Sequence, residues 1–409
     1  MPDRPRQPGD LQARSVSPTR TDESAPRVTF SLTDGGPLRH LTRALGLTRA
    51  PLGGFGPGVV LAMFTWGPLL LLTVVQALGG DGRLLRSFID SVSSHARLLV
   101  AIPLFFAAET WIDPRIRHFV EHLVDSGLVP RSDVDRLATT VRTASRLRDS
   151  VLAEAGLLAL VIAFATAGVR MGQPSATAYW QVPGGSLSLA GWWYVAVALP
   201  VYQFLIGRWL WRLMIWWFLL WRLSRLRLQL IPVHPDLAGG LGHLGVVVSH
   251  FGVLGLAFST SLAGGFFEDM RFNAVPLRQF LFPALELVAL TLIICVGPLF
   301  FFAPRMLAVK RQGLREYGRL GTAYVRGFHE KWIAGPPPDE PLLGSADIQS
   351  LADLAGSFDI IRQMRLIPIG PGLILPLIVA TLVPMLPLLL VAFSADDLLL
   401  RLLGLLFGV

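Results

Sequence analysis

Histidine and carboxylate side chains gather in one stretch rich in proline and glycine, residues 231–245. The candidates in this loop are His234, Asp236, Gly239, Gly240, Gly242 and His243. Imidazole and carboxylate groups bind metals or protons, and glycine amides at the start of a helix suit an anion. The same residues also fit a structural role, in which proline and glycine turn the chain and Asp236 caps a helix. The sequence leaves a cation or an anionic head group at this loop as a hypothesis, and it predicts no metal ion and no cofactor.

A second set of ionisable residues lies within or beside long apolar runs. It consists of Glu109, Glu154, Arg208, Arg212, His250 and Glu286. Charges at such depth are costly unless they are paired or hydrated. Arg208 and Arg212 share one helical face, so we expect the glutamates to serve as counter-ions, either around a water-filled vestibule or in structural ion pairs. Glu286 is the best single candidate for a buried carboxylate, and His250 is its only deep partner of opposite potential charge.

A third pattern, His118-Phe-Val-Glu121-His122, matches the inverted zincin motif H-x-x-E-H. Two histidines four residues apart can bind zinc, and Glu121 would be the base. No third ligand can be nominated, and all three polar side chains lie opposite an apolar helix face. The pattern therefore favours a solvated helix face over a metallopeptidase site.

The composition shows what must position these residues. The chain is 52% hydrophobic and only 16% charged, whereas an ordinary soluble domain has about 25% charged residues. The net charge of +8 is explained by basic cytoplasmic loops rather than by nucleic acid. The single cysteine, Cys295, excludes an intrachain disulfide. We therefore expect an all-α, polytopic helical membrane protein.

Seven apolar segments are long enough to predict membrane spans. They are approximately 57–79, 94–112, 152–169, 188–207, 244–264, 279–303 and 372–394. The second is the weakest because Glu109 interrupts it, and a model with six spans omits it.

Basic residues support the seven-span arrangement with the N-terminus inside. The inside segments then hold 29 of the 36 Arg and Lys residues, as cytoplasmic loops usually do. Dropping the second span would put the Arg-rich segment 113–150 outside. Arg222, Arg225 and Arg227, where the helix from residue 188 is expected to bend along the inner surface, would meet anionic lipid head groups.

The span boundaries divide the chain into six parts. They are a disordered, basic cytoplasmic tail (1–50), a transmembrane hairpin (51–112), a cytoplasmic helical hairpin (113–150), a four-span core (151–303), cytoplasmic amphipathic helices (304–365), and the last span with an apolar C-terminal tail (366–409). The apolar faces of the cytoplasmic helices cannot stay exposed. They could pack on each other, on the membrane surface, or on a second copy in a homo-oligomer.

Three motifs carry a resemblance. They are the run from His234 to Gly242, the segment from Tyr317 to Trp332, and Asp347-Ile-Gln-Ser-Leu-Ala-Asp-Leu. These resemble segments of uncharacterised bacterial polytopic inner-membrane proteins, over the second half of the chain. The resemblance implies a bacterial inner membrane and nothing about activity.

Three functions remain open from the sequence. The first is transport or conduction of a small ion or polar solute, which would depend on Glu286, His250 and the inner Glu/Arg set. The second is a membrane-embedded sensor or scaffold that acts through its cytoplasmic helices. The third is a membrane enzyme acting on lipid-linked substrates with His234, Asp236 and His243.

Overall fold

The computed structural model describes residues 28–36, 55–171, 179–335 and 346–392, and its regular elements in these ranges are all helical. The prediction of an all-α polytopic membrane protein is confirmed. The helices on which the argument depends are α2 (Gly56–Leu78), α3 (Gly82–Ile89), α4 (Val92–His95), α5 (Ile102–Asp125), α6 (Val134–Arg148), α7 (Val151–Met171), α9 (Leu199–Ser224), α10 (Gly242–Ser249), α11 (Gly252–Phe272), α12 (Leu281–Val296), α13 (Ala303–His329), α14 (Ala346–Gln363), α15 (Pro371–Leu382) and α16 (Pro387–Ala392).

Six helical runs within the described residues are long and apolar enough to cross a membrane. They are Gly56–Leu78, Val92–Asp125, Leu189–Ser224, Gly242–Phe272, Leu277–Ala334 and Pro371–Ala392. The predicted second span, which the charge distribution required, is among them. The predicted span 152–169 coincides with the 21-residue helix α7, and its crossing of the membrane stays a prediction.

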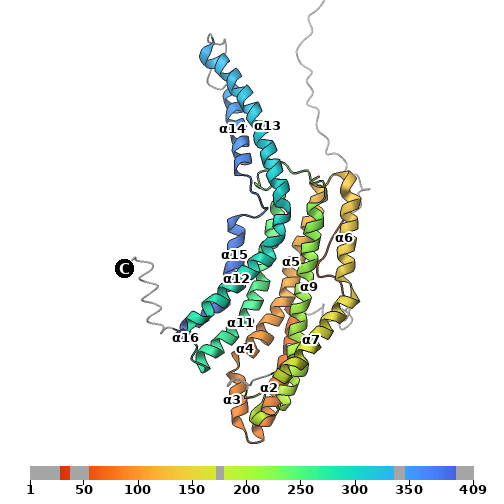
Figure 1. Ribbon diagram of the computed structural model, residues 1–409, viewed down its shortest axis with the longest axis vertical. Coiled ribbons are helices and arrows are strands. Elements are labelled where there is room, and N and C mark those ends of the chain that lie inside the picture. Colours follow the sequence, from red (N-terminus) through yellow and green to blue (C-terminus); the bar gives the residue numbers. More distant parts are fainter. Residues whose placement is uncertain (1–27, 37–54, 172–178, 336–345, 393–409) are drawn as a thin grey trace, which may run out of the picture.

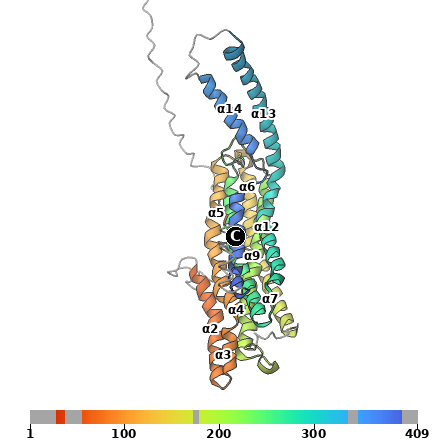
Figure 2. The same cartoon turned by 90° about the vertical axis from the view of Figure 1, so that its left-hand side faces the viewer.

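The helices form an upright bundle with an arm at one end (Figures 1 and 2). Helices α2, α7, α11 and α15 run towards the end that carries α3, and α5, α9 and α12 run back (Figure 1). The arm consists of α13 and α14, which pack against each other beyond the bundle. We call the two ends the arm side and the α3 side.

Two helices extend beyond the predicted spans, and one of them ends sooner than predicted. The helix of the second span continues past residue 112 to Asp125, where Ser126 and Gly127 (φ 72°) turn the chain. The predicted cytoplasmic hairpin therefore begins inside α5. Helix α9 ends at Ser224 and does not bend along the surface past Arg227. In both cases, packing inside the bundle extends the helix beyond its apolar run.

Residues 28–36 form an extended strap that packs into the bundle, so the prediction of disorder over 1–50 is wrong for this part. Phe30 is 1% exposed and Leu32 is 0% exposed. Apolar and polar residues alternate from Val28 to Leu32, and the buried side chains follow that alternation. The rest of the predicted tail lies outside the described residues, as do residues 393–409 of the predicted apolar C-terminal tail.

Small residues bring α10 and α11 close to their neighbours. A Cβ atom at Gly245 would lie 2.7 Å from the Pro368 carbonyl oxygen, and one at Gly255 would lie 2.5 Å from Thr381 Oγ1. Such close backbone approach is typical of helix contacts in membranes. These contacts place α11 beside α15 and α12.

The run from α12 to α13 links the bundle to the arm. Between the two helices, Gly297–Phe302 forms a 3₁₀ stretch, a feature that often marks a hinge. Pro298 lacks the amide that would normally bind the Ile294 carbonyl. The Trp217 indole donates to that carbonyl instead, at 2.8 Å.

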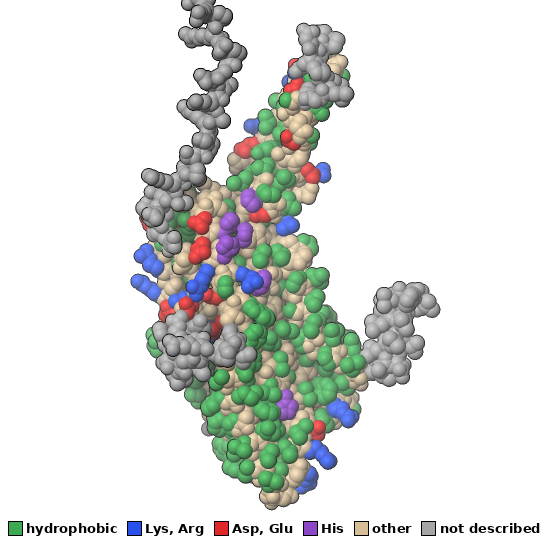
Figure 3. Space-filling model, turned by 180° about the vertical axis from the view of Figure 1, so that it is seen from behind, with side chains coloured by type: hydrophobic (Ala, Val, Ile, Leu, Met, Phe, Trp, Pro, Cys, Tyr) green, Lys and Arg blue, Asp and Glu red, His purple; other side chains and the backbone are tan. Residues whose placement is uncertain are grey.

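On the face of the bundle that Figure 3 shows, hydrophobic side chains cover much of the surface, and charged side chains gather at its two ends and along the arm. Exposed apolar residues include Leu152 (86% exposed) and Phe282 (81% exposed). A surface of this kind suits hydrocarbon and not water. An apolar surface between two charged ends agrees with a bundle that spans a bilayer.

Candidate functional site

The structure brings four of the predicted ionisable residues into one buried cluster near the arm side. Glu109 Oε1 accepts hydrogen bonds from Arg212 Nη1 at 2.7 Å and from Arg208 Nη1 at 3.1 Å. All three side chains are nearly buried, at 7%, 3% and 5% exposure respectively. Glu154 Oε1 from α7 lies 3.5 Å from Arg208 Nε. The cluster therefore ties α5, α7 and α9 together through charge.

The strap closes over this cluster. Arg212 Nη2 donates to the Thr33 carbonyl at 3.4 Å. Asp113, one helical turn after Glu109, accepts from the amides of Leu32 and Thr33 at 2.8 and 3.0 Å, and from the Ser31 hydroxyl. The Arg148 guanidinium donates to the Ser31 carbonyl. This arrangement agrees with structural ion pairs, one of the two interpretations of the sequence.

Asp236 organises the proline- and glycine-rich loop from within. Its carboxylate accepts from the amides of Ala238 and Gly242 at 2.8 Å each, and from that of Gly240. Gly239 and Gly240 have φ values of 68° and 99°, which glycine adopts without strain. Desolvation would raise the pKa of Asp236, but the three amides and His234 hold it below its ordinary value. The carboxylate is thus engaged in shaping the loop.

The same loop joins several elements on the arm side. The Leu237 carbonyl accepts from the Arg365 amide at 2.8 Å, and the Leu128 carbonyl accepts from the Gln229 amide at 2.8 Å. A Cβ at Gly313 of α13 would lie 2.8 Å from Pro232. Structurally, the loop connects the turn after α5, the base of the arm and the chain after α14.

Three histidines that are distant in the sequence meet at the edge of this loop. The ring of His243 lies 4.3 Å from that of His122 and 5.5 Å from that of His118, between centroids. Histidine side chains gather on this face of the arm side (Figure 3). The sequence motif predicted the pair on α5, but it did not identify a third residue. Even with His243, no group of three His, Cys, Asp or Glu side chains in the described ranges is arranged to hold a metal ion.

Glu286 and His250 do not form the predicted deep pair. Helices α11 and α12 are antiparallel, and a Cβ at Gly255 would lie 3.2 Å from Thr291. From that level, Glu286 lies towards the α3 side and His250 towards the arm side, so about 15 Å of helix rise separates them. Glu286 is exposed on the lipid-facing surface of α12, and His250 Nδ1 bonds the Val246 carbonyl at 2.7 Å.

Two of the arginines predicted to meet lipid head groups stack on aromatic rings at the end of α9. Arg222 lies 5.8 Å from the Phe218 ring and Arg225 lies 5.7 Å from the Trp221 ring. The Arg227 amide donates to Asp133 at 3.0 Å. All three are exposed on the arm side, and their contact with anionic lipid stays a prediction.

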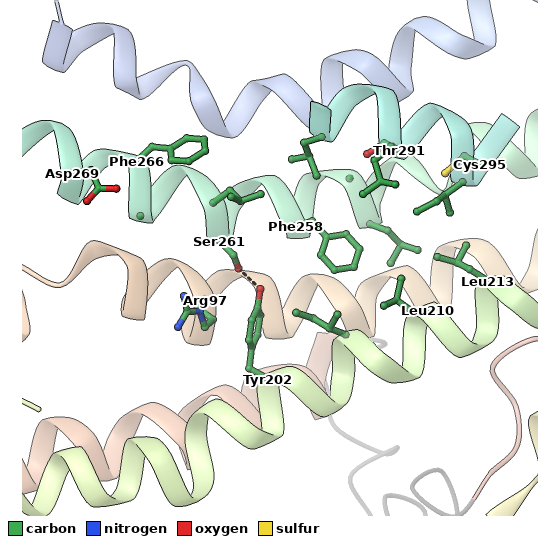
Figure 4. A pocket seen from close by; sticks show the side chains of 18 residues that line it. Arg97, Tyr202, Leu210, Leu213, Phe258, Ser261, Phe266, Asp269, Thr291 and Cys295 are labelled. Atoms are coloured by element: carbon green, nitrogen blue, oxygen red, sulfur yellow. Dashed lines mark hydrogen bonds between the residues drawn. The ribbon is translucent and has the colours of Figure 1, made fainter. Parts of the chain in front are cut away.

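A pocket of about 540 Å³, which no sequence pattern predicted, lies between α9, α11 and α12. Its size is that of a small-molecule site, for which about 300–1,000 Å³ is usual. Most of the wall is apolar, and Phe258 lies at its centre with Leu210 and Leu213 on the α9 side (Figure 4). One end is polar, with Arg97 and Asp269, and Tyr202 donates to Ser261 at 2.6 Å next to it, while Thr291 and Cys295 lie towards the other end (Figure 4).

Arg97 and Asp269 give that polar end one charge of each sign. The Arg97 guanidinium lies 5.4 Å from the centre of the Tyr202 ring and donates to the Tyr194 hydroxyl. Its Nε is buried without a hydrogen-bond partner among the described residues. Asp269 accepts from Asn273 Nδ2 at 2.9 Å. No hydropathy pattern could have revealed the pocket, because its wall combines Arg97 and α9 with α11 and α12, which lie far from them in the sequence.

Comparisons of the chain with protein-family models, with curated proteins and with solved structures found no match.

Proposed function

We propose that the protein is a membrane-embedded sensor or scaffold, in which occupancy of the pocket sets the position of the arm. The observation that carries this proposal is the helical run Leu277–Ala334. Its α12 part contributes Leu287, Leu290 and Cys295 to the pocket wall, and its α13 part forms the arm. One helical run thus has one part against the candidate ligand site and the other part outside the bundle.

The hinge between the two parts supports the transmission of a movement from the pocket to the arm. The 3₁₀ stretch begins two residues after Cys295 of the pocket wall. Pro298 and the Trp217 hydrogen bond hold its geometry. A ligand that displaces α12 therefore acts on the segment that sets the angle of α13. Hinges of this kind convert small local shifts into larger movements of a rigid element.

The arm has the surface of a protein-contact element. Leu320, Val325 and Ile333 on it are each more than half exposed. Lys331 and Trp332 both bond Asp347 Oδ2, which joins α13 to α14. Exposed apolar side chains outside a bilayer often mark a surface that binds another protein. The excess of arginine and lysine on the arm side supports a cytoplasmic arm, and the resemblance noted above supports a bacterial inner membrane.

A spin-label distance measurement tests the proposal. Labels at Ser126→Cys and Gly327→Cys, in a Cys295→Ala background, report the distance between bundle and arm. Gly265 lines the pocket and has open space where its Cβ would be, so Gly265→Leu should fill the pocket and shift the distance distribution by several ångström. Gly156→Leu on α7, where a Cβ also meets nothing, is the matched control. Superimposable distributions for the two variants would contradict the proposal.

Transport of a small ion or polar solute is the second candidate, and the charge cluster around Glu109 favours it. Buried ionisable residues in membrane helices often mark ion pathways. Purified protein in tight liposomes would then conduct, and Glu109→Gln would alter the flux. Vesicles that stay impermeable to common cations, anions and protons would exclude this candidate.

A further inference from the structure

The pocket has the dimensions of a lipid site. It extends along α11 from Leu254 to Asp269, which is about 22 Å at 1.5 Å of rise per residue. Asp269 lies within one turn of the end of α11 at Phe272, so the polar end is at the level of the α3-side interface. The hydrocarbon core of a bilayer is about 30 Å thick. The pocket therefore reaches from the interface past the middle of the bilayer.

Lipid has direct access to this pocket. Leu210, Leu262 and Leu290 line it and are 42%, 38% and 50% exposed on the apolar surface of the bundle. The wall offers water few hydrogen-bond partners, because Phe258 and aliphatic side chains form most of it. An acyl chain is the occupant that both the wall and the surroundings favour.

The polar end selects the head group by charge. Arg97 presents a cation with a buried, unpartnered Nε, which suits a phosphate. Asp269 presents a carboxylate at the same end, which suits an ammonium group and repels a purely anionic head. Glu268 lies nearby, where it accepts from the Ser93 amide at 2.7 Å, so this end carries no excess of positive charge.

We infer that the pocket binds a zwitterionic phospholipid bearing a primary amine, with the phosphate at Arg97, the ammonium at Asp269 and one acyl chain along α11. This inference names the ligand of the sensor and rests on that proposed function for its consequence, although the binding itself can be measured separately. The protein would then report the lipid composition of its own membrane.

Photo-crosslinking tests the inference on the full chain. The probe is lysophosphatidylethanolamine with a diazirine on its acyl chain, added to phosphatidylcholine nanodiscs that hold the purified protein. We expect labelled peptides from α9, α11 and α12. Unlabelled lysophosphatidylethanolamine should compete, whereas lysophosphatidylglycerol and lysophosphatidylcholine should compete about tenfold less well, because each lacks a charged hydrogen bond. Labelling spread evenly over the lipid-facing surface, or better competition by lysophosphatidylglycerol, would overturn the inference.

Three variants of the pocket and one control variant separate the site from its surroundings. Gly265→Leu should abolish labelling of the pocket while it keeps every polar group, and Gly156→Leu should leave the labelling intact. Arg97→Gln and Asp269→Asn should each reduce labelling about tenfold. If either charge variant fails to fold, Gly265→Leu still decides, because unchanged labelling in that variant contradicts the site.

The two proposals fail in different ways. Labelling of the pocket together with an arm that never moves would remove the sensor and keep the lipid site. An arm that responds to Gly265→Leu, in a protein that does not select lysophosphatidylethanolamine, would keep the sensor and remove this ligand.

Discussion

Glu109 lies at the centre of a buried charge cluster that joins three helices. It binds two guanidinium groups, from Arg208 and Arg212, and Arg208 also reaches Glu154. Burying such charges is costly, so their value lies in being paired. The spacing of the two arginines predicted that they share a face. The identity of the residue opposite them could not be predicted, because Glu109 is about a hundred residues away in the chain.

Neutralising Glu109 should destabilise the protein strongly. Glu109→Gln leaves two buried arginines with a weaker partner, and losing one member of a buried pair costs about 3–5 kcal/mol. Unfolding by SDS in mixed micelles measures the change. Glu286→Gln is the control, because Glu286 is exposed, and its effect should stay within about 0.5 kcal/mol. Equal stability of the two variants would show that the cluster is not structurally important.

Asp236 should keep its loop ordered in mild acid. The folded-state pKa of this carboxyl is lowered, so its stabilising contribution is complete above the ordinary pKa of about 3.9. That contribution is lost only as the pH falls through the lower, folded-state pKa. Hydrogen exchange over residues 231–244 should therefore show protection that persists to about pH 4. Asp236→Ala should remove this protection at every pH, and undiminished protection in that variant would contradict the assigned role.

The strap shows why the ends of ordered segments could not be predicted from the sequence. Hydropathy located the spans because one long apolar run suffices to predict a membrane helix. The five residues from Val28 to Leu32 alternate correctly for a half-buried extended segment, but a pattern this short also occurs by chance in polar tails. Its order depends on Asp113 and Arg212, which only tertiary contact brings to it.

Shortening one buried side chain of the strap should weaken the whole bundle. Leu32 is fully buried, so Leu32→Ala should lower the free energy of unfolding by about 2–5 kcal/mol. Thermal unfolding in lipid micelles measures this. Leu152→Ala, at a side chain that is 86% exposed, should change stability by no more than about 0.5 kcal/mol. A neutral Leu32→Ala would mean that the strap is not part of the folded core.

The hinge offers a double-mutant test. Trp217→Phe removes the indole donor from the Ile294 carbonyl and should cost about 1 kcal/mol. In a Pro298→Ala background the cost should shrink, because residue 298 then has an amide that can bind that carbonyl. Unfolding free energies of the four proteins give the coupling energy. Additive effects would contradict the account of how proline and tryptophan hold this hinge.

Over the whole molecule, the sequence predicted the class and the positions of the six long apolar helices, because the bilayer imposes these on any spanning chain. The seventh predicted crossing, at 152–169, stays a prediction. It could not predict the pocket, the histidine group around His243 or the separation of Glu286 from His250. Each of these depends on which helices are neighbours and on how they are rotated. Packing decides that, and apolar runs of similar hydropathy carry little information about it.

In the arrangement that we propose, one helical run, Leu277–Ala334, crosses the membrane and carries the arm to the cytoplasmic side, while the pocket opens towards the other leaflet. Single cysteines at Gly327 on the arm and at Gly82 on α3, each in the Cys295→Ala background, test it with a membrane-impermeant maleimide. In cells with an accessible plasma membrane, the account predicts labelling of Gly82→Cys alone, and in inverted vesicles labelling of Gly327→Cys alone. Labelling of both positions from the same side would contradict it.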